Sequence, residues 1–242
     1  MEDRNLKFGD LEREPDIRML SDMEEVIKDQ KWLRHADDMP LYFMYRDLYL
    51  ERDRKAIRSQ DVRYDITVIP PARLGDEYVK TKGHYHENAR KGLSYPEIYE
   101  VIQGEAHYLM QKKEDNKIKD VIVVKAEAGD KVLIPPNYGH ITINPSDETL
   151  VMANWVSTRF DSIYADIMDK QGGVYYETIS RGFITNPNYV LAPPIRFLDP
   201  FEVEEMDIVH DNMMYSMIRE PDNLRFLNHP EKFMWVFEPM QN

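Results

Sequence analysis

Short hydrophobic segments recur along the middle of the chain, and turn residues separate them. Pro70-Pro71, Gly104 and Pro135-Pro136 interrupt the pattern, and residues of these types punctuate strands. Many short strands at close spacing predict an all-β barrel or sandwich. The predicted strands cover residues 64–69, 77–86, 97–103, 106–111, 119–125, 131–134, 140–144 and 150–156.

The flanks have a different character. Residues 1–60 are charged, with a further strand predicted over residues 41–45, and the Ser21/Glu24 spacing predicts a helix begun by a capping box. Residues 161–171 have a helical pattern, and residues from 193 onward are irregular and rich in Met. We therefore expect three regions: an N-terminal arm packed on the barrel (residues 1–60), the barrel (61–160), and a helix with a C-terminal extension (161–242).

The C-terminal extension is too apolar for a solvated tail. Burying a large apolar side chain contributes roughly 1.5–3 kcal/mol, so we expect the extension to pack on the barrel or on a second subunit. The residues that carry this expectation are Phe226, Leu227, Phe233, Trp235 and Phe237.

Composition narrows the classes of partner and location. The 242 residues carry a formal net charge of −13 and no cysteine. The negative charge argues against nucleic acid and anionic membranes as partners, and the absence of cysteine fits a cytoplasmic protein. No run of 18 apolar residues occurs, and the first residues lack the basic and apolar regions of a signal peptide, so we expect neither a membrane span nor secretion.

Four residues suggest a metal site. His84 and His86 are two positions apart, so they point to one face of a strand, and Glu97 and His140 follow at the start of later predicted strands. These four side chains would meet if the strands fold back into a barrel. Three neutral imidazoles and one carboxylate suit a divalent transition metal.

The spacing of these residues resembles the two motifs of the cupin superfamily. His84-x-His86 and Glu97-x6-Gly104 follow the first motif, although the ten residues between His86 and Glu97 are more than that motif allows. Asn137 replaces a glycine of the second motif, in line with the tolerance of Asn for positive φ. The other positions of the second motif are Gly129, Pro135, His140 and Asn144. The resemblance implies a jelly-roll barrel, a double-stranded β-helix, with one bound metal.

Within the cupins, the chain is most similar to the archaeal-type glucose-6-phosphate isomerases. The similarity runs from about residue 15 to residue 190 and is specific only in a few blocks. These blocks are residues 18–23, 67–71, 81–86, 97–99 and 135–140. The family implies a homodimer with one divalent metal per subunit, which interconverts glucose 6-phosphate and fructose 6-phosphate.

The resemblance also implies roles for individual residues. His84, His86, Glu97 and His140 match the metal ligands, for which we expect Fe2+ first, with Mn2+, Ni2+ or Zn2+ as other candidates. The phosphate-holding positions of the family are matched by Thr67, Thr81 and Gly83. The tyrosines that line the sugar site are matched by Tyr42 and Tyr99.

Two features of the sequence depart from the pattern of the family. Where the family often has His-Asp-Tyr, residues 160–164 read Phe-Asp-Ser-Ile-Tyr, so the histidine is absent. In a regular strand Thr81 would also face away from His84 and His86, unless Gly83 makes a bulge that changes the face.

Metal-dependent isomerisation is the function that the resemblance implies. A Lewis-acid metal would polarise the sugar carbonyl, and Glu97, with Tyr99 beside it, is the candidate to move a proton between C1 and C2. A hydride shift is the competing chemistry. Two other functions stay open: a cupin dioxygenase or decarboxylase, and a non-catalytic sugar-binding cupin. The histidines at positions 35, 107, 210 and 229 lack partners at useful spacing and are expected to be surface or core residues.

Overall fold

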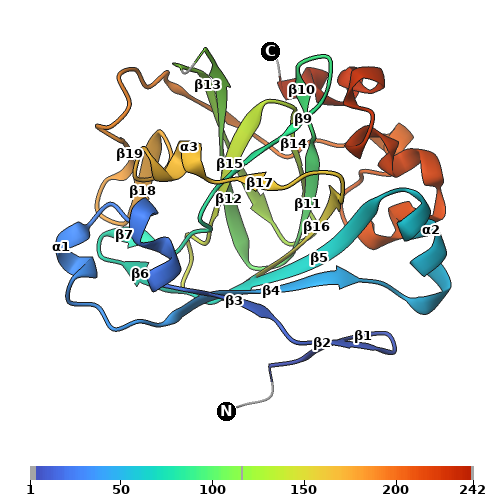
Figure 1. Ribbon diagram of the computed structural model, residues 1–242, viewed down its shortest axis with the longest axis horizontal. Coiled ribbons are helices and arrows are strands. Elements are labelled where there is room, and N and C mark those ends of the chain that lie inside the picture. Colours follow the sequence, from blue (N-terminus) through green and yellow to red (C-terminus); the bar gives the residue numbers. More distant parts are fainter. Residues whose placement is uncertain (1–3, 116, 241–242) are drawn as a thin grey trace.

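Two sheets, antiparallel except for one strand pair, form the barrel (Figure 1). The computed structural model describes residues 4–115 and 117–240. One sheet has six strands in the order β14-β11-β16-β5-β4-β3, and the other has four in the order β15-β12-β13-β20. The predicted all-β jelly-roll barrel is confirmed.

The strands of the two barrel sheets come mainly from residues 62–157. In the six-stranded sheet they are β14 (Lys131–Ile134), β11 (Glu97–Gln103), β16 (Leu150–Ser157), β5 (Val62–Ile69), β4 (Pro40–Leu48) and β3 (Asp16–Met19). In the four-stranded sheet they are β15 (Tyr138–Ile143), β12 (Glu105–Glu114), β13 (Lys117–Glu127) and β20 (Ile195–Leu198), which pairs parallel to β13.

Shorter strands and helices surround the barrel. The remaining strands are β1 (Leu6–Phe8), β2 (Leu11–Arg13), β6 (Arg73–Leu74), β7 (Glu77–Tyr78), β8 (Tyr85–His86), β9 (Asn88–Arg90), β10 (Leu93–Ser94), β17 (Ser162–Ile163), β18 (Tyr175–Thr178) and β19 (Gly182–Thr185). The α-helices are α1 (Gln30–Leu33), α2 (Arg54–Ser59) and α3 (Ala165–Met168). The 3-10 helices are η1 (Ser21–Val26), η2 (Glu51–Asp53), η3 (Glu204–Met206), η4 (Met214–Arg219), η5 (Pro221–Leu227), η6 (Pro230–Lys232) and η7 (Met234–Met240).

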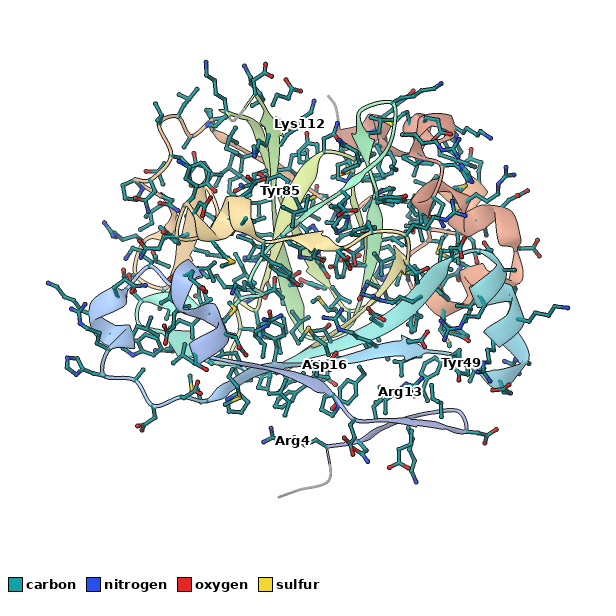
Figure 2. All side chains as sticks on the ribbon, viewed as in Figure 1. Arg4, Arg13, Asp16, Tyr49, Tyr85 and Lys112 are labelled. Carbon is teal, nitrogen blue, oxygen red and sulfur yellow. The ribbon has the colours of Figure 1, made fainter. Side chains whose placement is uncertain are left out.

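Side chains from both sheets fill the barrel (Figure 2). Tyr99 on β11 and Tyr108 on β12 contact each other with ring centroids 5.2 Å apart. Glu97, Tyr99 and Val101 alternate along β11 and are all buried, as their shared face predicted. At the end of β11, Gly104 has φ +83°, and a Cβ there would lie 2.9 Å from the Thr149 carbonyl oxygen. The turn into β12 therefore requires glycine.

The segment expected as one strand over residues 77–86 is two short strands, β7 and β8, with irregular chain between them. Gly83 has φ +76°, a conformation that cannot continue a strand. A Cβ at Gly83 would also lie 2.5 Å from Cγ1 of Ile141. The face of Thr81 is therefore decided by this irregular segment and not by strand alternation.

The predicted capping box at Ser21 is wrong. The segment is the 3-10 helix η1, and the Ser21 hydroxyl donates to Asp38 (3.0 Å) instead of capping a backbone N–H. The helix expected over residues 161–171 is also shorter, since β17 comes first and α3 spans only Ala165–Met168. In both cases contacts with distant parts of the chain override the local pattern.

The C-terminal extension contacts both sheets: β20 pairs with β13 in the four-stranded sheet, and later residues pack on the six-stranded sheet. The indole N–H of Trp155 on β16 donates to the Met214 carbonyl at 3.0 Å. Phe226, Leu227 and Phe237 are fully buried, whereas Trp235 is 41% exposed. The expected packing on the barrel thus holds for these three side chains, and Phe233 is partly buried against the same core. The indole of Trp235 lies on the surface of this subunit. Within the described residues, no helix is both long and apolar enough to cross a membrane.

Candidate functional site

Four side chains from three parts of the barrel converge on one point. His84 and His86 lie at β8, Glu97 begins β11, and His140 lies on β15. Backbone hydrogen bonds link His84 to His140 in both directions, at 3.2 and 3.0 Å. One possible ligand atom from each of the four residues lies within 4.8 Å of the others. The structure therefore brings together all four residues that the sequence suggested as metal ligands.

The ligand atoms face one another across a short distance. Nε2 of His86 and Nε2 of His140 lie 3.3 and 3.4 Å from Oε2 of Glu97. This buried oxygen makes no hydrogen bond within the described residues. A buried carboxylate oxygen without a partner is costly, and a divalent cation between it and the imidazoles would satisfy it. The donor set of three imidazoles and one carboxylate thus fits a transition metal.

The long loop between His86 and Glu97 fixes one imidazole. Nδ1 of His86 lies 2.8 Å from the Tyr95 carbonyl oxygen. A carbonyl can only accept, so Nδ1 carries the proton and Nε2 keeps its lone pair for a ligand. The side chain of Asn137 accepts from the Ser94 N–H at 2.9 Å and holds the loop against the barrel. Its φ of +71° confirms the turn conformation predicted for this residue.

Asn154 is a residue that sequence reasoning missed. It lies buried on β16, and its side-chain amide donates to Oε1 of Glu97 at 2.7 Å. The bond leaves only Oε2 facing the histidines. Nothing in the β16 segment distinguishes Asn154 from any other polar strand residue, because the contact depends on the pairing of β16 with β11.

The electrostatics of the site favour neutral imidazoles and an ionised carboxylate. Burial, together with the rings of His140 and His86, holds the pKa of His84 well below its usual value, and burial lowers the pKa of His140. Burial alone would raise the pKa of Glu97, but the adjacent imidazoles of His140 and His86 hold it well below its usual range. Burial and the nearby Glu97 raise the pKa of Tyr99 far above its usual value. Tyr99 is therefore a neutral phenol.

These residues line a cavity of about 360 Å³. Tyr99 lies in its wall, with its hydroxyl 3.1 Å from Nε2 of His140. The residues matched to sugar and phosphate positions all line the same cavity: Tyr42, Thr67, Thr81 and Gly83.

Thr81 and Gly83, which were expected to hold the phosphate, also make contacts within the protein. The Thr81 hydroxyl accepts from the Thr142 N–H at 3.0 Å, which leaves its proton for another acceptor. Side chains of Ile141 and Ile167 occupy the space where a Cβ of Gly83 would be. The glycine at this position therefore serves the packing of the barrel, besides exposing backbone to the cavity.

Further residues line the cavity, including two in the segment that replaces His-Asp-Tyr of the family. Phe160 packs on the ring of His86, with centroids 4.3 Å apart, in the segment that lacks the family histidine. Tyr164 lies 5.5 Å from His84, centroid to centroid. Arg18 and Lys82 bring positive charge to the end near Tyr42. Arg18 and Lys82 lie within blocks that carried the family resemblance, which was the only signal for them in the sequence.

The other histidines lie outside this cavity. His107 is a core histidine, as expected for this group, and its Nδ1 lies 2.8 Å from the Glu177 carboxylate. These two residues are seventy positions apart, so local spacing could not reveal the pair. His210 pairs with Asp130 at 3.0 Å on the surface.

The chain is similar to a known family of proteins. The sequence profile of the family described as "Glucose-6-phosphate isomerase (GPI)" matches residues 17–190. The chain belongs to the glucose-6-phosphate isomerase family. Two similar relatives are the glucose-6-phosphate isomerases of Pyrococcus furiosus, 31% identical over 138 residues, and of Thermococcus onnurineus, 32% identical over 134 residues.

The family match leaves part of the chain without a counterpart. The aligned regions span 56% and 50% of this chain and 66% and 67% of those two relatives. Residues 191–242 lie beyond the family profile. Among solved structures, oxalate decarboxylase from Bacillus subtilis superposes with a TM-score of 0.36 and 18% identity, over 51% of this chain and 27% of that chain.

Proposed function

We propose that the chain is a metal-dependent aldose–ketose isomerase that interconverts glucose 6-phosphate and fructose 6-phosphate. The observation that carries the proposal is the convergence of His84, His86, Glu97 and His140 in a cavity of the family-matched region. The cavity adds hydroxyl and cationic groups suited to a phosphorylated sugar. No feature of this site favours a dioxygenase, a decarboxylase or a storage protein over the isomerase.

His84, His86 and His140 would hold the metal through Nε2, and Glu97 through Oε2. Fe2+ is the first candidate, and Mn2+, Ni2+ and Zn2+ accept the same donor set. When bound, such a cation would supply Lewis-acid polarisation of the carbonyl of an open-chain sugar. The depressed pKa values of His84 and His140 keep these imidazoles neutral and available near neutral pH.

The end of the cavity near Tyr42 would hold the phosphate. Thr67 and Thr81 offer hydroxyl groups there. Arg18 lies over the Tyr42 ring at 6.0 Å, and its Nε is buried with no hydrogen-bond partner in the described residues. A buried donor without a partner favours an anionic ligand that completes it.

Glu97 is the proposed proton carrier between C1 and C2. Its carboxylate is ionised, because its pKa is low, and the amide of Asn154 fixes its orientation. Tyr99, which stays protonated, would donate a hydrogen bond to a sugar oxygen as negative charge develops. A hydride shift would bypass Glu97 and remains the competing route.

We also infer a homodimer and a cytoplasmic location. Both follow from the family resemblance, and the absence of cysteine fits the location.

The decisive experiment is a metal-reconstituted assay. The protein is stripped with a chelator, metals are added back one at a time, and glucose 6-phosphate, glucose and mannose 6-phosphate are offered with product analysis. We expect activity only with metal, and a preference for the phosphorylated sugar, because each buried donor left unpaired by glucose costs about 1–3 kcal/mol. Full activity of verified metal-free protein would refute the proposal, as would equal efficiency on glucose. An oxygen electrode in the same assay tests the dioxygenase alternative.

A further inference from the structure

The lining of the cavity is positive, although the chain as a whole is acidic. Four cationic side chains line it, against two carboxylates besides Glu97, whereas the whole chain carries a formal charge of −13. The cationic residues are Arg18, Arg46, Arg63 and Lys82, and the carboxylates are Asp65 and Asp161. A single terminal phosphate has no need of so many cations.

The cations form two groups at different places along the strands. Arg18 pairs with Tyr42 between β3 and β4, next to the proposed phosphate end. Arg46 comes four residues after Tyr42 on β4. Arg63 comes four residues before Thr67 on β5. Since β4 and β5 are antiparallel, both shifts lead in the same direction. At about 3.3 Å per residue this is a separation of ~13 Å along the backbone, so the two groups extend into the cavity from different positions.

Arg63 is held rigidly with part of its guanidinium unused. Its Nε donates to Asp65 at 2.8 Å, and the other oxygen of Asp65 accepts from the Asp47 N–H at 2.9 Å. Within the described residues, the two terminal Nη groups of Arg63 make no hydrogen bond, and its side chain is 32% exposed. A guanidinium fixed at Nε presents its Nη donors as a preformed fork for an anion.

The carboxylates nearby offset part of the charge of this group, but within the described residues they leave the Nη donors of Arg63 unused. Asp65 is already committed to Arg63 and to a backbone N–H. Arg46 contacts Asp16 at 3.0 Å, but Asp16 lies on the edge strand β3 (Figure 2) with 68% of its side chain exposed. Asp161 is also exposed. Exposed carboxylates are screened by water and salt, so the main offset to the charge of Arg63 is the buried Asp65, and an anion would bind at the Nη donors that Asp65 does not use.

This second group lies on the side of the cavity nearest the candidate metal ligands. Arg63 pairs with Val156, and Val156 pairs with Glu97, so the three residues form one row across β5, β16 and β11. Thr67 lies four residues further along β5 and pairs with Met152. A sugar with its phosphate near Thr67 and its C1 and C2 oxygens near Glu97 therefore directs its C1 end toward Arg63.

We propose that Arg46 and Arg63 form a second anion subsite, which takes sugar phosphates that carry another anionic group at the C1 end. The proposal rests on the proposed function, since the isomerase substrate sets the direction of the sugar. Such ligands have a phosphate or carboxylate at C1. Neither class offers the free C1 group that isomerisation needs, so both would occupy the site without turnover and compete with the substrate.

The test compares two ligands that differ by one phosphate. Glucitol 1,6-bisphosphate and glucitol 6-phosphate are titrated calorimetrically into metal-reconstituted protein, with gluconate 6-phosphate as the carboxylate arm. We expect the bisphosphate to bind at least about tenfold more tightly, as for a charge-assisted contact. Arg63→Met and Arg46→Met should each remove most of that advantage, and Arg52→Met, at an exposed arginine outside the cavity, should keep it.

Arg63→Met leaves Asp65 buried without its cation, so folding needs a control. The double variant Arg63→Met/Asp65→Asn removes both charges, and its melting temperature and its affinity for glucitol 6-phosphate report whether the cavity is intact. Arg46→Met leaves only the exposed Asp16 unpaired and gives a second route to the same answer.

The outcomes separate the subsite from the isomerase proposal. Equal binding of the two glucitol phosphates, or an advantage that survives in both arginine variants, would overturn the subsite. Arg63→Met could remove the tighter binding of the bisphosphate, relative to glucitol 6-phosphate, but keep the tighter binding of gluconate 6-phosphate. That result supports the subsite and restricts it to phosphate. Isomerisation of glucose 6-phosphate by the same preparation tests the proposed function separately, since either result can fail without the other.

Discussion

The side-chain amide of Asn154 donates to Oε1 of Glu97 at 2.7 Å, from the neighbouring strand of the same sheet. The bond commits one carboxylate oxygen to the protein and leaves the other, Oε2, facing His86 and His140. Asn154 thereby decides how Glu97 can approach a cation, without contacting that cation itself.

Replacing Asn154 with Ala should weaken metal binding by about 10–100-fold, the usual effect of removing a partner that orients a ligand. The freed oxygen could then rotate, and the ligand geometry would loosen. Competition with a chromophoric chelator measures the affinity. Asn212→Ala, at an exposed asparagine whose side chain bonds only Asp207 among the described residues, is the matched control. An unchanged affinity in Asn154→Ala would mean that the barrel alone orients Glu97.

The roles of Glu97 can be separated by two substitutions. Glu97→Gln keeps the shape but removes charge and basicity, so metal should bind more weakly through the histidines while turnover falls by about 10²–10⁴. His140→Ala should lose metal and activity together. Substrate deuterated at C2 tests the route in the same assay, because a proton carrier exchanges the label with water and a hydride shift moves it to C1. Near-normal turnover in metal-loaded Glu97→Gln would leave Glu97 as a ligand only.

The stability of the metal-free protein should fall below about pH 6.5, the pKa of histidine in an unfolded chain. Burial lowers the folded-state pKa values of His84 and His140. Below the pKa of the unfolded chain, these histidines bind protons in the unfolded chain but not in the folded protein. The free energy of unfolding therefore decreases as pH falls. Urea denaturation of chelator-treated protein between pH 5 and 8 measures this. A His84→Gln variant should show a shallower slope, and an identical slope would point to other groups.

Phe226 and Trp235 provide a paired test of the C-terminal extension. Phe226 is fully buried, and Trp235 is 41% exposed. Phe226→Ala should lower the free energy of unfolding by about 3–5 kcal/mol, because it leaves a cavity, while Trp235→Ala should cost much less. Urea denaturation of both variants gives the comparison. A small effect at Phe226 would show that the extension unfolds separately from the barrel.

Much of the candidate site was predictable from the sequence because it depends on local spacing. His84 and His86 share a face through their two-residue separation, and Glu97 shares a face with Tyr99 and Val101 on one strand. The positive φ of Asn137 follows from its place in a turn. Each of these properties belongs to a few consecutive residues, and strand geometry translates such short patterns directly into side-chain direction.

Tertiary structure alone decided the rest. The contacts of Asn154 with Glu97, and the row that links Glu97 to Arg63, depend on strand register, which a single strand does not encode. The pairing of His107 with Glu177 joins residues seventy positions apart. The capping box at Ser21 failed for the same reason, since Asp38 competes for its hydroxyl. A local pattern fixes which way a side chain points, but its partner is chosen by how distant segments pack together.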